Sequence, residues 1–380
     1  MKHTQSVFND SRPMADLTAA FLLYIRDAQT DSEQLDQLDK TYSLLEDCIK
    51  QAEKVFARGE TGWFVQTLRQ LSTVFVDVAL RLGRLAEDPN LTKAGEAARV
   101  LSRPMAVAAN DRTGESPTKR DALFFLANLT FRIYFAMNNL RLCDTIINNT
   151  NNSSANIDQT KNSFPKCDRS AFCYYRGRLF LYQRRLPHAR NELRKSLELC
   201  HSDHWHNGRL ILIYLTVASL PLGHFPSIEL LRHFNLEDYF SHLIQALAVG
   251  SCKGNFVHVL SELDRHQAWH RSKGNYLLLR EKLEETCWRN LVRRTLFVTT
   301  NGQPMPPTGP PTLSLTSLAT AAQISFNDPT IDVDDAESMS ASMIEQGYIK
   351  AYVLHSKRLL VLQKGQQVGL PPISQIKGFS

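Results

Sequence analysis

Two apolar runs near the C-terminus establish the class of fold, Ile349-Lys-Ala-Tyr-Val-Leu354 and Arg358-Leu-Leu-Val-Leu362. They flank the polar triplet His355-Ser-Lys357. Short runs of β-branched, aromatic and apolar residues on either side of a polar turn are typical of a β-hairpin. The pattern therefore predicts a two-stranded wing at this end of the chain.

The residues before the hairpin supply helices for the wing to pack against. A short helix is expected around Leu313 to Ala322, followed by an extended Ile324-Ser-Phe326. A second helix is expected to open at Asp334, with Glu337 three residues later as an approximate capping box, and to close at Gly347. Helix, strand, helix and two-stranded wing, in this order, predict a winged helix.

The rest of the chain is predicted to be helical. Within residues 173–200, small and bulky residues alternate in a tetratricopeptide-like pattern, at Gly177, Phe180, Ala189, Leu193 and Ser196. Further helical stretches are predicted at 210–222, 226–234, 238–249, 255–270 and 276–297. Helical hairpins of this kind stack into a superhelix because each one alone leaves an apolar face uncovered.

The predicted fold class is therefore all-α, a tetratricopeptide-like helical-repeat superhelix followed by a C-terminal winged helix. The expected parts are an N-terminal helical region (1–115), the superhelix (116–300), a Pro-rich insert (301–312), the winged helix (313–364) and a tail (365–380).

Three stretches inside these parts have a distinct composition. Residues 121–135 are apolar around the whole helix, which predicts burial on most sides. Residues 148–162 are rich in Asn and Ser, which predicts an exposed or disordered loop. Five prolines within 301–312 predict a stiff exposed excursion.

Composition argues against several classes of protein. The 380 residues are 43% hydrophobic and 22% charged, as in an ordinary soluble globular protein. Seven cysteines, an odd number in a long chain, favour reduced thiols over a disulfide framework. The early apolar run Phe21 to Ile25 is too short for a secretory signal, and no stretch approaches the roughly 18 apolar residues of a membrane span. We therefore expect neither secretion nor a contact with membranes.

No motif for catalysis is present. The sequence lacks a GxSxG elbow, a P-loop, an HExxH pair and a GxGxxG fingerprint. We therefore expect no catalytic residues and no cofactor. An enzyme of a new type is the third alternative, behind the two scaffold functions described below.

One cluster resembles a metal site, Cys200-His201-x-x-His204-x-His206 with Cys167 and Cys173 upstream. Its spacing does not match the usual zinc ligand sets, so it is interpreted as solvated turn histidines and the chain is predicted to hold no metal. A second cluster, Asp332, Asp334 and Asp335, suggests a divalent ion at first sight. Its position at the start of a helix is explained by capping and the helix dipole.

The distribution of charge carries more information than the net charge of +6. Residues 169–200 contain eight Lys or Arg against two acids, a local balance that equals the net charge of the whole chain. This stretch is either a solvated helix face or a groove for an acidic protein segment. In a repeat hairpin one face packs and the other is left for a ligand. Arg184 and Arg185 are therefore the candidate partner-binding residues.

Acidic and basic residues are segregated within the predicted winged helix. Residues 301–347 contain no Lys or Arg, so the acidic second helix would meet phosphate repulsion in a major groove. The wing and the end of the preceding helix are basic instead. The candidate nucleic-acid-binding residues are Arg293, Arg294, Lys350, Lys357 and Arg358.

Contacts of these cations with phosphates would hold nucleic acid without sequence specificity, and the affinity would fall steeply with salt. The sequence does not choose between RNA and DNA. Tyr348 and Tyr352 are candidates for stacking on a single strand, and strand alternation indicates that at least one of them packs inward.

Several stretches carry a resemblance to a known family, Arg209-Leu-Ile-Leu-Ile-Tyr-Leu-Thr-Val217, Leu222-Gly-His-Phe-Pro-Ser-Ile-Glu-Leu-Leu231 and Trp288-Arg-Asn-Leu-Val-Arg-Arg294. Together with the expected fold, they resemble the PCI domain. Within it, they are similar to the PCI-domain subunit of the nuclear-pore-associated transcription-export complex and to its signalosome-associated fungal relative. The resemblance also includes Tyr134 to Cys143 and Gly347 to Tyr352.

This resemblance implies a non-enzymatic scaffold. The protein would pair through its winged helix with a larger PCI-containing scaffold subunit of the export complex (GANP-like), and would bind a small acidic disordered subunit shared with the proteasome lid. The assembly would bind RNA or DNA during mRNA export from the nucleus, at the nuclear pore, with some of the protein in the cytoplasm. The alternative is a signalosome-associated PCI subunit that acts only through protein contacts.

Overall fold

The computed structural model describes residues 12–28, 34–59, 61–112, 118–152, 164–248, 254–303, 309–365, 368–373 and 376. These ranges are almost entirely helical and end in a small wing, which confirms the predicted fold class. The chain divides into two compact units, Met1–Leu179 with Glu198–Cys200 and Phe180–Leu197 with His201–Ser380. The domain boundaries expected from the sequence remain predictions. None of the described helices is long and apolar enough to cross a membrane.

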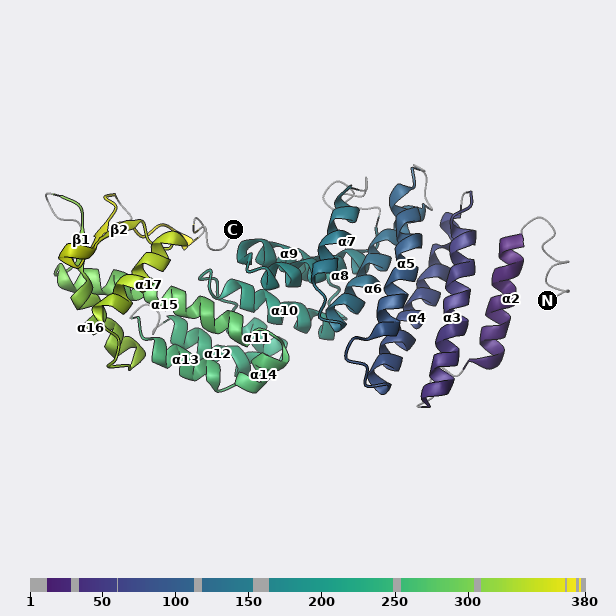
Figure 1. Cartoon of the computed structure of the whole chain (residues 1–380), viewed down its shortest axis with the longest axis horizontal. Helices are drawn as coiled ribbons and strands as arrows, with labels where there is room; N and C mark the ends of the chain where they lie inside the picture. Colours follow the sequence, from purple (N-terminus) through teal and green to yellow (C-terminus); the bar gives the residue numbers. More distant parts are fainter. Residues whose placement is uncertain are drawn as a thin grey trace. The chain divides into compact units, whose positions relative to one another are not determined.

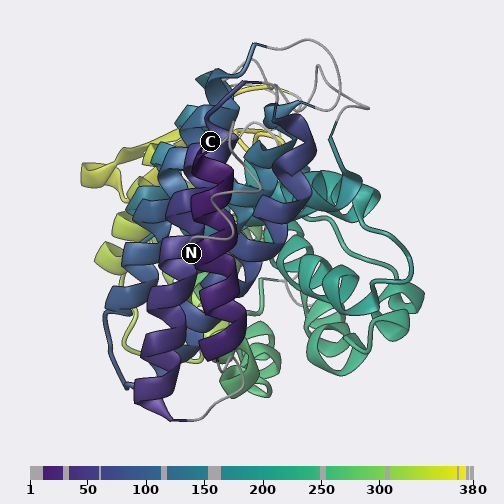
Figure 2. The same ribbon diagram turned by 90° about the vertical axis from the view of Figure 1, so that its right-hand side faces the viewer.

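The first unit is a stack of helices in which sequence neighbours lie side by side, as Figure 1 and Figure 2 show. Its members are α2 (Arg12–Asp27), α3 (Leu35–Phe56), η1 (Gly62–Phe64), α4 (Val65–Leu85), α5 (Thr92–Asn110), η2 (Lys119–Ala122), α6 (Leu123–Ala136), α7 (Arg141–Asn152) and most of α8 (Lys166–Tyr182).

The core of this stack follows the apolar spacing of its helices. On α3, Leu38, Tyr42, Leu45 and Ile49 recur every three or four residues and are fully buried. The Tyr42 ring stacks on Phe75 of α4, with ring centroids 5.1 Å apart. A face of this kind stabilises a helix because its apolar side chains leave water when the neighbour packs on it.

Helix α6 is the most buried helix of the unit. Five successive residues, Leu123 to Ala127, are all buried, which confirms the burial predicted for 121–135. Phe124 contacts Phe164 at a centroid distance of 4.6 Å and Phe172 of α8 at 5.1 Å. The apolar residues of α6 are therefore covered by neighbouring helices on most sides, and Arg132 marks a side that stays open to solvent.

An ion pair joins α4 to α8 across this unit. Arg69 Nη1 donates to Asp168 Oδ1 at 2.8 Å, and its second amino group donates to the other carboxylate oxygen. The guanidinium also lies over the Phe125 ring, 4.4 Å from its centroid. Asn128 Nδ2 donates to the Asp168 carbonyl oxygen at 2.8 Å. The contact ties together residues 99 positions apart in the sequence.

The second unit contains the rest of the helical repeat. Its helices are α9 (Leu186–Leu199), α10 (Trp205–Ser219), α11 (Ile228–His233), α12 (Glu237–Ala246), α13 (Phe256–Asp264), α14 (Gln267–Ser272) and α15 (Tyr276–Thr299). The stretch predicted to be helical at 255–270 is helical, and a turn divides it into α13 and α14. The turn lets Trp269 stack on Tyr239 of α12, with ring centroids 4.1 Å apart.

The winged helix follows α15. It consists of β1 (Thr312–Ser314), α16 (Leu315–Phe326), α17 (Val333–Glu345), β2 (Ala351–Leu354), η4 (His355–Lys357) and β3 (Leu359–Leu362). The three strands are antiparallel neighbours in the order β1-β3-β2, so β3 is central. Gly347 has φ of 81° and follows the end of α17, which confirms the predicted stop.

The winged helix is fixed to α13 and α15 of the same unit. Phe326 at the end of α16 lies 4.9 Å from the Phe256 ring and 5.5 Å from the Trp288 ring, centroid to centroid. Ser325 donates to the Gly254 carbonyl and accepts from the Phe256 N–H at 3.3 Å. Buried rings and satisfied backbone groups together hold the winged helix on the last repeat helices.

Three details of the winged helix differ from the prediction. The extended Ile324–Phe326 is wrong: these residues continue α16, because helical spacing brings Ser325 and Phe326 onto α13 and α15. The capping residues are Asp332 and Asp335, which exchange side-chain bonds with each other's backbone N–H at 2.8 and 3.0 Å. Strand β1 is additional, and three residues are too few for a sequence pattern.

The predicted loop at 148–162 is wrong at its start. Helix α7 continues to Asn152, with Ile146 and Ile147 buried and the Thr150 hydroxyl bonded to the Ile146 carbonyl at 2.8 Å. Residues 153–162 lie outside the described ranges, as do Cys252 and three prolines of the insert, Pro304, Pro306 and Pro307. The six described cysteines are free thiols.

Candidate nucleic-acid and partner interface

The wing hairpin positions Lys357 and Arg358 at its turn. Strands β2 and β3 pair with Leu354 opposite Leu359, and η4 fills the turn between them. Arg358 has φ of 50°, a left-handed conformation that favours Gly or Asn. Its carbonyl accepts the Leu315 N–H at 2.9 Å, which fixes the turn to the start of α16. The chain therefore keeps a long cationic side chain where the backbone would favour a small residue.

All five candidate nucleic-acid-binding side chains are exposed, and among the described residues none of them forms an ion pair with a carboxylate. Unpaired cations on one subdomain attract polyanions, because their charge is not neutralised by the protein itself. The five are Arg293, Arg294, Lys350, Lys357 and Arg358.

Arg293 and Arg294 form a separate group on the exposed face of α15. The Arg294 guanidinium lies over the Phe297 ring, 5.8 Å from its centroid, and Phe297 and Val298 are exposed one turn further on. Helix α15 packs on β1, the neighbour of β3. Arg293 and Arg294 therefore lie on α15, Lys357 and Arg358 lie at the turn of the wing, and Lys350 lies directly before β2, so the structure distributes the five cations over the subdomain.

Helix α17 is acidic at its start, and three of the acids there, Asp332, Asp335 and Glu337, have local partners. Asp332 and Asp335 cap the helix reciprocally, which accounts for the Asp cluster without a divalent ion. Glu337 accepts a bond from His355 Nδ1 at 2.9 Å, which ties α17 to the turn of the wing. This bond to Glu337 raises the pKa of His355 above its usual range. The carboxylates at this end of α17 support the prediction that the helix repels phosphate.

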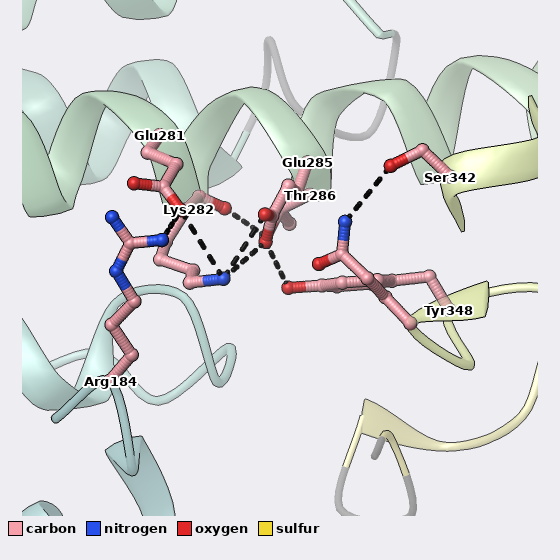
Figure 3. Close-up of polar contacts among 8 residues, drawn as sticks. Arg184, Glu281, Lys282, Glu285, Thr286, Ser342 and Tyr348 are labelled. Carbon is pink, nitrogen blue, oxygen red and sulfur yellow. Dashed lines mark hydrogen bonds and ion pairs between the residues drawn. The ribbon is translucent and has the colours of Figure 1, made fainter. Parts of the chain in front are cut away.

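The base of the wing is anchored by a polar network, drawn in Figure 3. The Tyr348 hydroxyl donates to Glu285 of α15. Lys282 Nζ, in a side chain only 4% exposed, lies 2.9 Å from Glu285 and 3.8 Å from Glu281. Burial and the bond to Glu285 raise the pKa of Tyr348, so this tyrosine stays protonated and donates. Tyr348 therefore anchors the wing to α15, and its buried ring is not available for stacking on a ligand.

A second polar contact joins α15 to the segment after the wing. Arg289, which is buried, donates from Nη2 to the Pro371 carbonyl at 2.7 Å. Burial, followed by the neighbouring charge of Arg293, lowers the pKa of Arg289. Gly369 accepts the Lys350 N–H on its carbonyl oxygen at 2.7 Å. The segment at 369–371 therefore fixes the backbone of Lys350 at the start of the wing.

The two candidate partner-binding residues have different surroundings. Arg184 has φ of 62° and extends its guanidinium to Glu281 of α15, with Nη1 2.6 Å from Oε1 (Figure 3). Arg185 lies over the Phe180 ring, 5.1 Å from its centroid. The Arg184 side chain is still 60% exposed, so a further carboxylate can reach it.

The rest of the basic stretch at 169–200 is not one uniform face. Arg169 is buried, Arg176 lies over the Phe172 ring at 5.6 Å, and Arg178 lies over the Phe135 ring at 4.5 Å. These three belong to the first compact unit, whereas the other five cations belong to the second. Part of the positive charge of this stretch therefore belongs to side chains that pack within the protein, on aromatic rings or in the interior.

The side chains of the Cys and His cluster around Cys200 and His204 do not point to one common site. Cys173 is fully buried whereas Cys167 is exposed, and His201 pairs with Asp203, with Nδ1 3.4 Å from the carboxylate. Across the ranges that the structure describes, no group of three His, Cys, Asp or Glu side chains is arranged to hold a metal ion. That the chain binds neither metal nor cofactor remains a prediction.

Sequence reasoning missed the anchors of the wing. Lys282 and Glu285 are recognisable as an i,i+3 pair, but such pairs are usually solvated. Nothing in the sequence shows that this pair is buried or that Tyr348 donates to it. The pairing needs the fold, because Tyr348 and Glu285 are 63 residues apart.

Comparisons with known proteins agree with this architecture. A PCI domain model matches residues 261–364. A PCI domain-containing protein of Schizosaccharomyces pombe is 31% identical over 386 residues, covering 98% of this chain and 83% of the relative. PCI domain-containing protein 2 of Xenopus laevis is 29% identical, with 84% and 76% covered. A CSN12 homolog of Gibberella zeae is 27% identical, with 70% and 58% covered.

The fold and its basic wing define a class, a helical-repeat scaffold that ends in a winged helix. PCI-domain proteins are such scaffolds, generally without catalytic activity, and act in multiprotein complexes. The chain belongs to the PCI domain-containing protein family, which is related to the signalosome type of PCI protein. None of these matches is to an enzyme family.

Proposed function

We propose that this protein is a non-enzymatic scaffold subunit of a multiprotein complex that binds nucleic acid and takes part in transcription-coupled mRNA export from the nucleus. The observation that carries the nucleic-acid part is the exposed, unpaired charge of Lys350, Lys357 and Arg358 on a wing whose backbone is fixed. The mRNA export part rests on the sequence resemblance. We place the protein at the nuclear pore, with some of it in the cytoplasm.

The proposed mode of binding is contact with phosphates. Lysine and arginine at the wing turn displace counterions from the nucleic-acid backbone, which supplies affinity without reading bases. The acidic start of α17 disfavours insertion of that helix into a groove. Five cations are few, so the chain alone is expected to bind weakly and to bind more strongly when a partner extends the basic surface.

Removal of both cations at the wing turn tests this proposal. We expect Lys357→Ala/Arg358→Ala to lower the salt slope of log affinity by roughly 0.7 to 0.9 for each phosphate that is no longer neutralised. The reduction should be equal for unrelated sequences, because backbone contacts carry no base information. The measurement is a salt titration on single-stranded RNA and duplex DNA, with and without the partner.

Two further variants control this experiment. Arg84→Ala/Arg103→Ala removes the same charge from exposed positions of the first unit and should leave the slope unchanged. Arg358→Gly removes the cation and supplies the residue that a positive φ favours, so weaker binding by it cannot come from a distorted turn. An unchanged slope and affinity in the double wing variant would contradict nucleic-acid binding by the wing.

The partners proposed for this protein rest on the sequence resemblance and on the exposed charge at Arg184. A larger PCI-containing subunit would pack on the winged helix, and a small acidic disordered subunit would bind the basic surface at Arg184 and Arg185. Membership of multiprotein complexes is common to PCI proteins and supports this arrangement. The exposed guanidinium of Arg184 offers the charge that an acidic segment needs.

Charge reversal tests the partner surface. We expect Arg184→Glu/Arg185→Glu to weaken binding of the acidic subunit about tenfold, since attraction becomes repulsion, and to leave nucleic-acid affinity nearly intact. Binding of both ligands is measured by titration of the purified chain.

Arg184→Glu also breaks the ion pair with Glu281, so a control is needed for that effect. Glu281→Gln removes the pair and keeps the cation. It should leave partner binding intact or strengthen it, because Arg184 is no longer neutralised. Loss of nucleic-acid affinity with unchanged partner binding would instead assign this face to phosphate.

The alternative, a signalosome-associated subunit that acts only through protein contacts, is kept because a CSN12 homolog is among the relatives. The two functions differ in the proteins that accompany the chain. Affinity purification from native extract should recover nuclear-pore-associated subunits if the export proposal is correct, and signalosome subunits if the alternative is correct.

A further inference from the structure

The two tyrosines at the wing have opposite environments. Tyr348 is 1% exposed and donates to Glu285, whereas Tyr352 is 56% exposed. In the part of the chain that the structure describes, the Tyr352 ring stacks on no other ring and its hydroxyl has no hydrogen-bond partner. Of these two tyrosines, only Tyr352 can therefore offer a ring face to a ligand.

The position of Tyr352 in the sheet places it beside a cation. It lies on β2, at the edge of the sheet, where its neighbour across the ladder is the smaller Val361. Lys350 lies two residues earlier, and side chains two apart along extended chain point to the same face. Both side chains are exposed. A flat ring and an ammonium group thus share one open face.

A second exposed aromatic residue in this subdomain lacks this arrangement. Phe297 of α15 is 47% exposed, but the Arg294 guanidinium lies over its ring. Single exposed apolar residues need no explanation in general. Tyr352 differs because, among the described residues, no cation or second ring lies over it and because it lies on the hairpin whose turn carries Lys357 and Arg358.

We infer that Tyr352 is a stacking platform for a base of single-stranded nucleic acid, with Lys350 and the two cations at the wing turn on the flanking phosphates. The inference rests on the proposed function and names its ligand class. Bases in a duplex are stacked on each other and offer no free face to a side-chain ring, whereas an unpaired base does. The wing therefore prefers single strands over duplex of the same length.

The test compares Tyr352→Ala, Tyr352→Phe and the parent chain on a single-stranded RNA and a duplex DNA of equal length. Loss of base stacking lowers affinity for the single strand by about 5- to 150-fold. Affinity for the duplex stays within about twofold, and the phenylalanine variant binds like the parent because the ring is kept. The salt slope is unchanged in both variants, since every cation that meets a phosphate is retained.

Phe225→Ala, a change at another exposed ring of the second unit (45% exposed against 56% for Tyr352), is the matched control and leaves both affinities unchanged. Equal losses on single strand and duplex would overturn the inference, because they indicate a structural role of Tyr352. No loss in Tyr352→Ala while Lys357→Ala/Arg358→Ala still weakens binding would overturn stacking alone. No loss in either variant would overturn the proposed function together with the inference.

Discussion

Replacing Glu285 by alanine is expected to lower the free energy of unfolding of the second unit by about 3 kcal/mol. Lys282, whose side chain is 4% exposed, loses the carboxylate at 2.9 Å, and the Glu281 carboxylate is more distant at 3.8 Å. Tyr348 loses its acceptor in the same variant. A buried charge without a partner costs more than the pair itself contributes, because the charge stays out of water. Urea unfolding of the full chain measures the change.

Two variants separate the effect of the buried Lys282 charge from the effect of the Tyr348 hydrogen bond. Lys282→Met/Glu285→Leu removes both charges and should be less destabilising than Glu285→Ala, because no buried charge is left. Tyr348→Phe removes only the hydroxyl and should cost about 1 kcal/mol. A destabilisation below about 1 kcal/mol in Glu285→Ala would show that water or Glu281 compensates Lys282, and that the network does not hold the wing.

The second large effect is expected in the first unit. Asp168→Ala should lower its free energy of unfolding by about 2 to 4 kcal/mol, because Arg69 is left half-buried against Phe125 without its carboxylate. The side chain of Arg69 is 26% exposed, so water compensates part of the loss and the upper end of the range for buried pairs is not reached.

Asp168→Asn is the matched variant, since it keeps the shape and one hydrogen bond and removes the charge. It should fall between the parent and Asp168→Ala. Hydrogen exchange locates the effect: faster exchange is expected in α4, α6 and α8, and unchanged exchange in the winged helix of the second unit. Faster exchange in the winged helix alone would contradict the assignment of this ion pair to the first unit.

Much of the architecture is readable from local chemistry. Apolar residues every three or four positions predict the helices, and the runs around His355 predict the wing, because these periods follow from backbone geometry alone. Gly347 marks the end of α17, since only a residue without Cβ adopts a positive φ there at no cost. The absence of Lys and Arg from 301–347 likewise establishes the polarity of the winged helix.

Local patterns fail where a long-range contact overrides them. Ile324–Phe326 reads as extended but is helical, because Phe326 packs on Phe256 and Trp288. The stretch at 169–200 reads as one basic surface, but Arg169 is buried and Arg178 lies over Phe135. In both cases the partner is distant in the sequence, and no local period encodes it.

The same distinction separates the two tyrosines of the wing. The sequence establishes that a wing with Lys350, Lys357 and Arg358 follows an acidic helix, since charge and strand propensity are properties of the residues themselves. It indicates that at least one of Tyr348 and Tyr352 packs inward, but not which of them does. Folding places Glu285 against Tyr348 and leaves Tyr352 at the open edge of the sheet. Burial depends on which element packs where, and this is a property of the assembled chain.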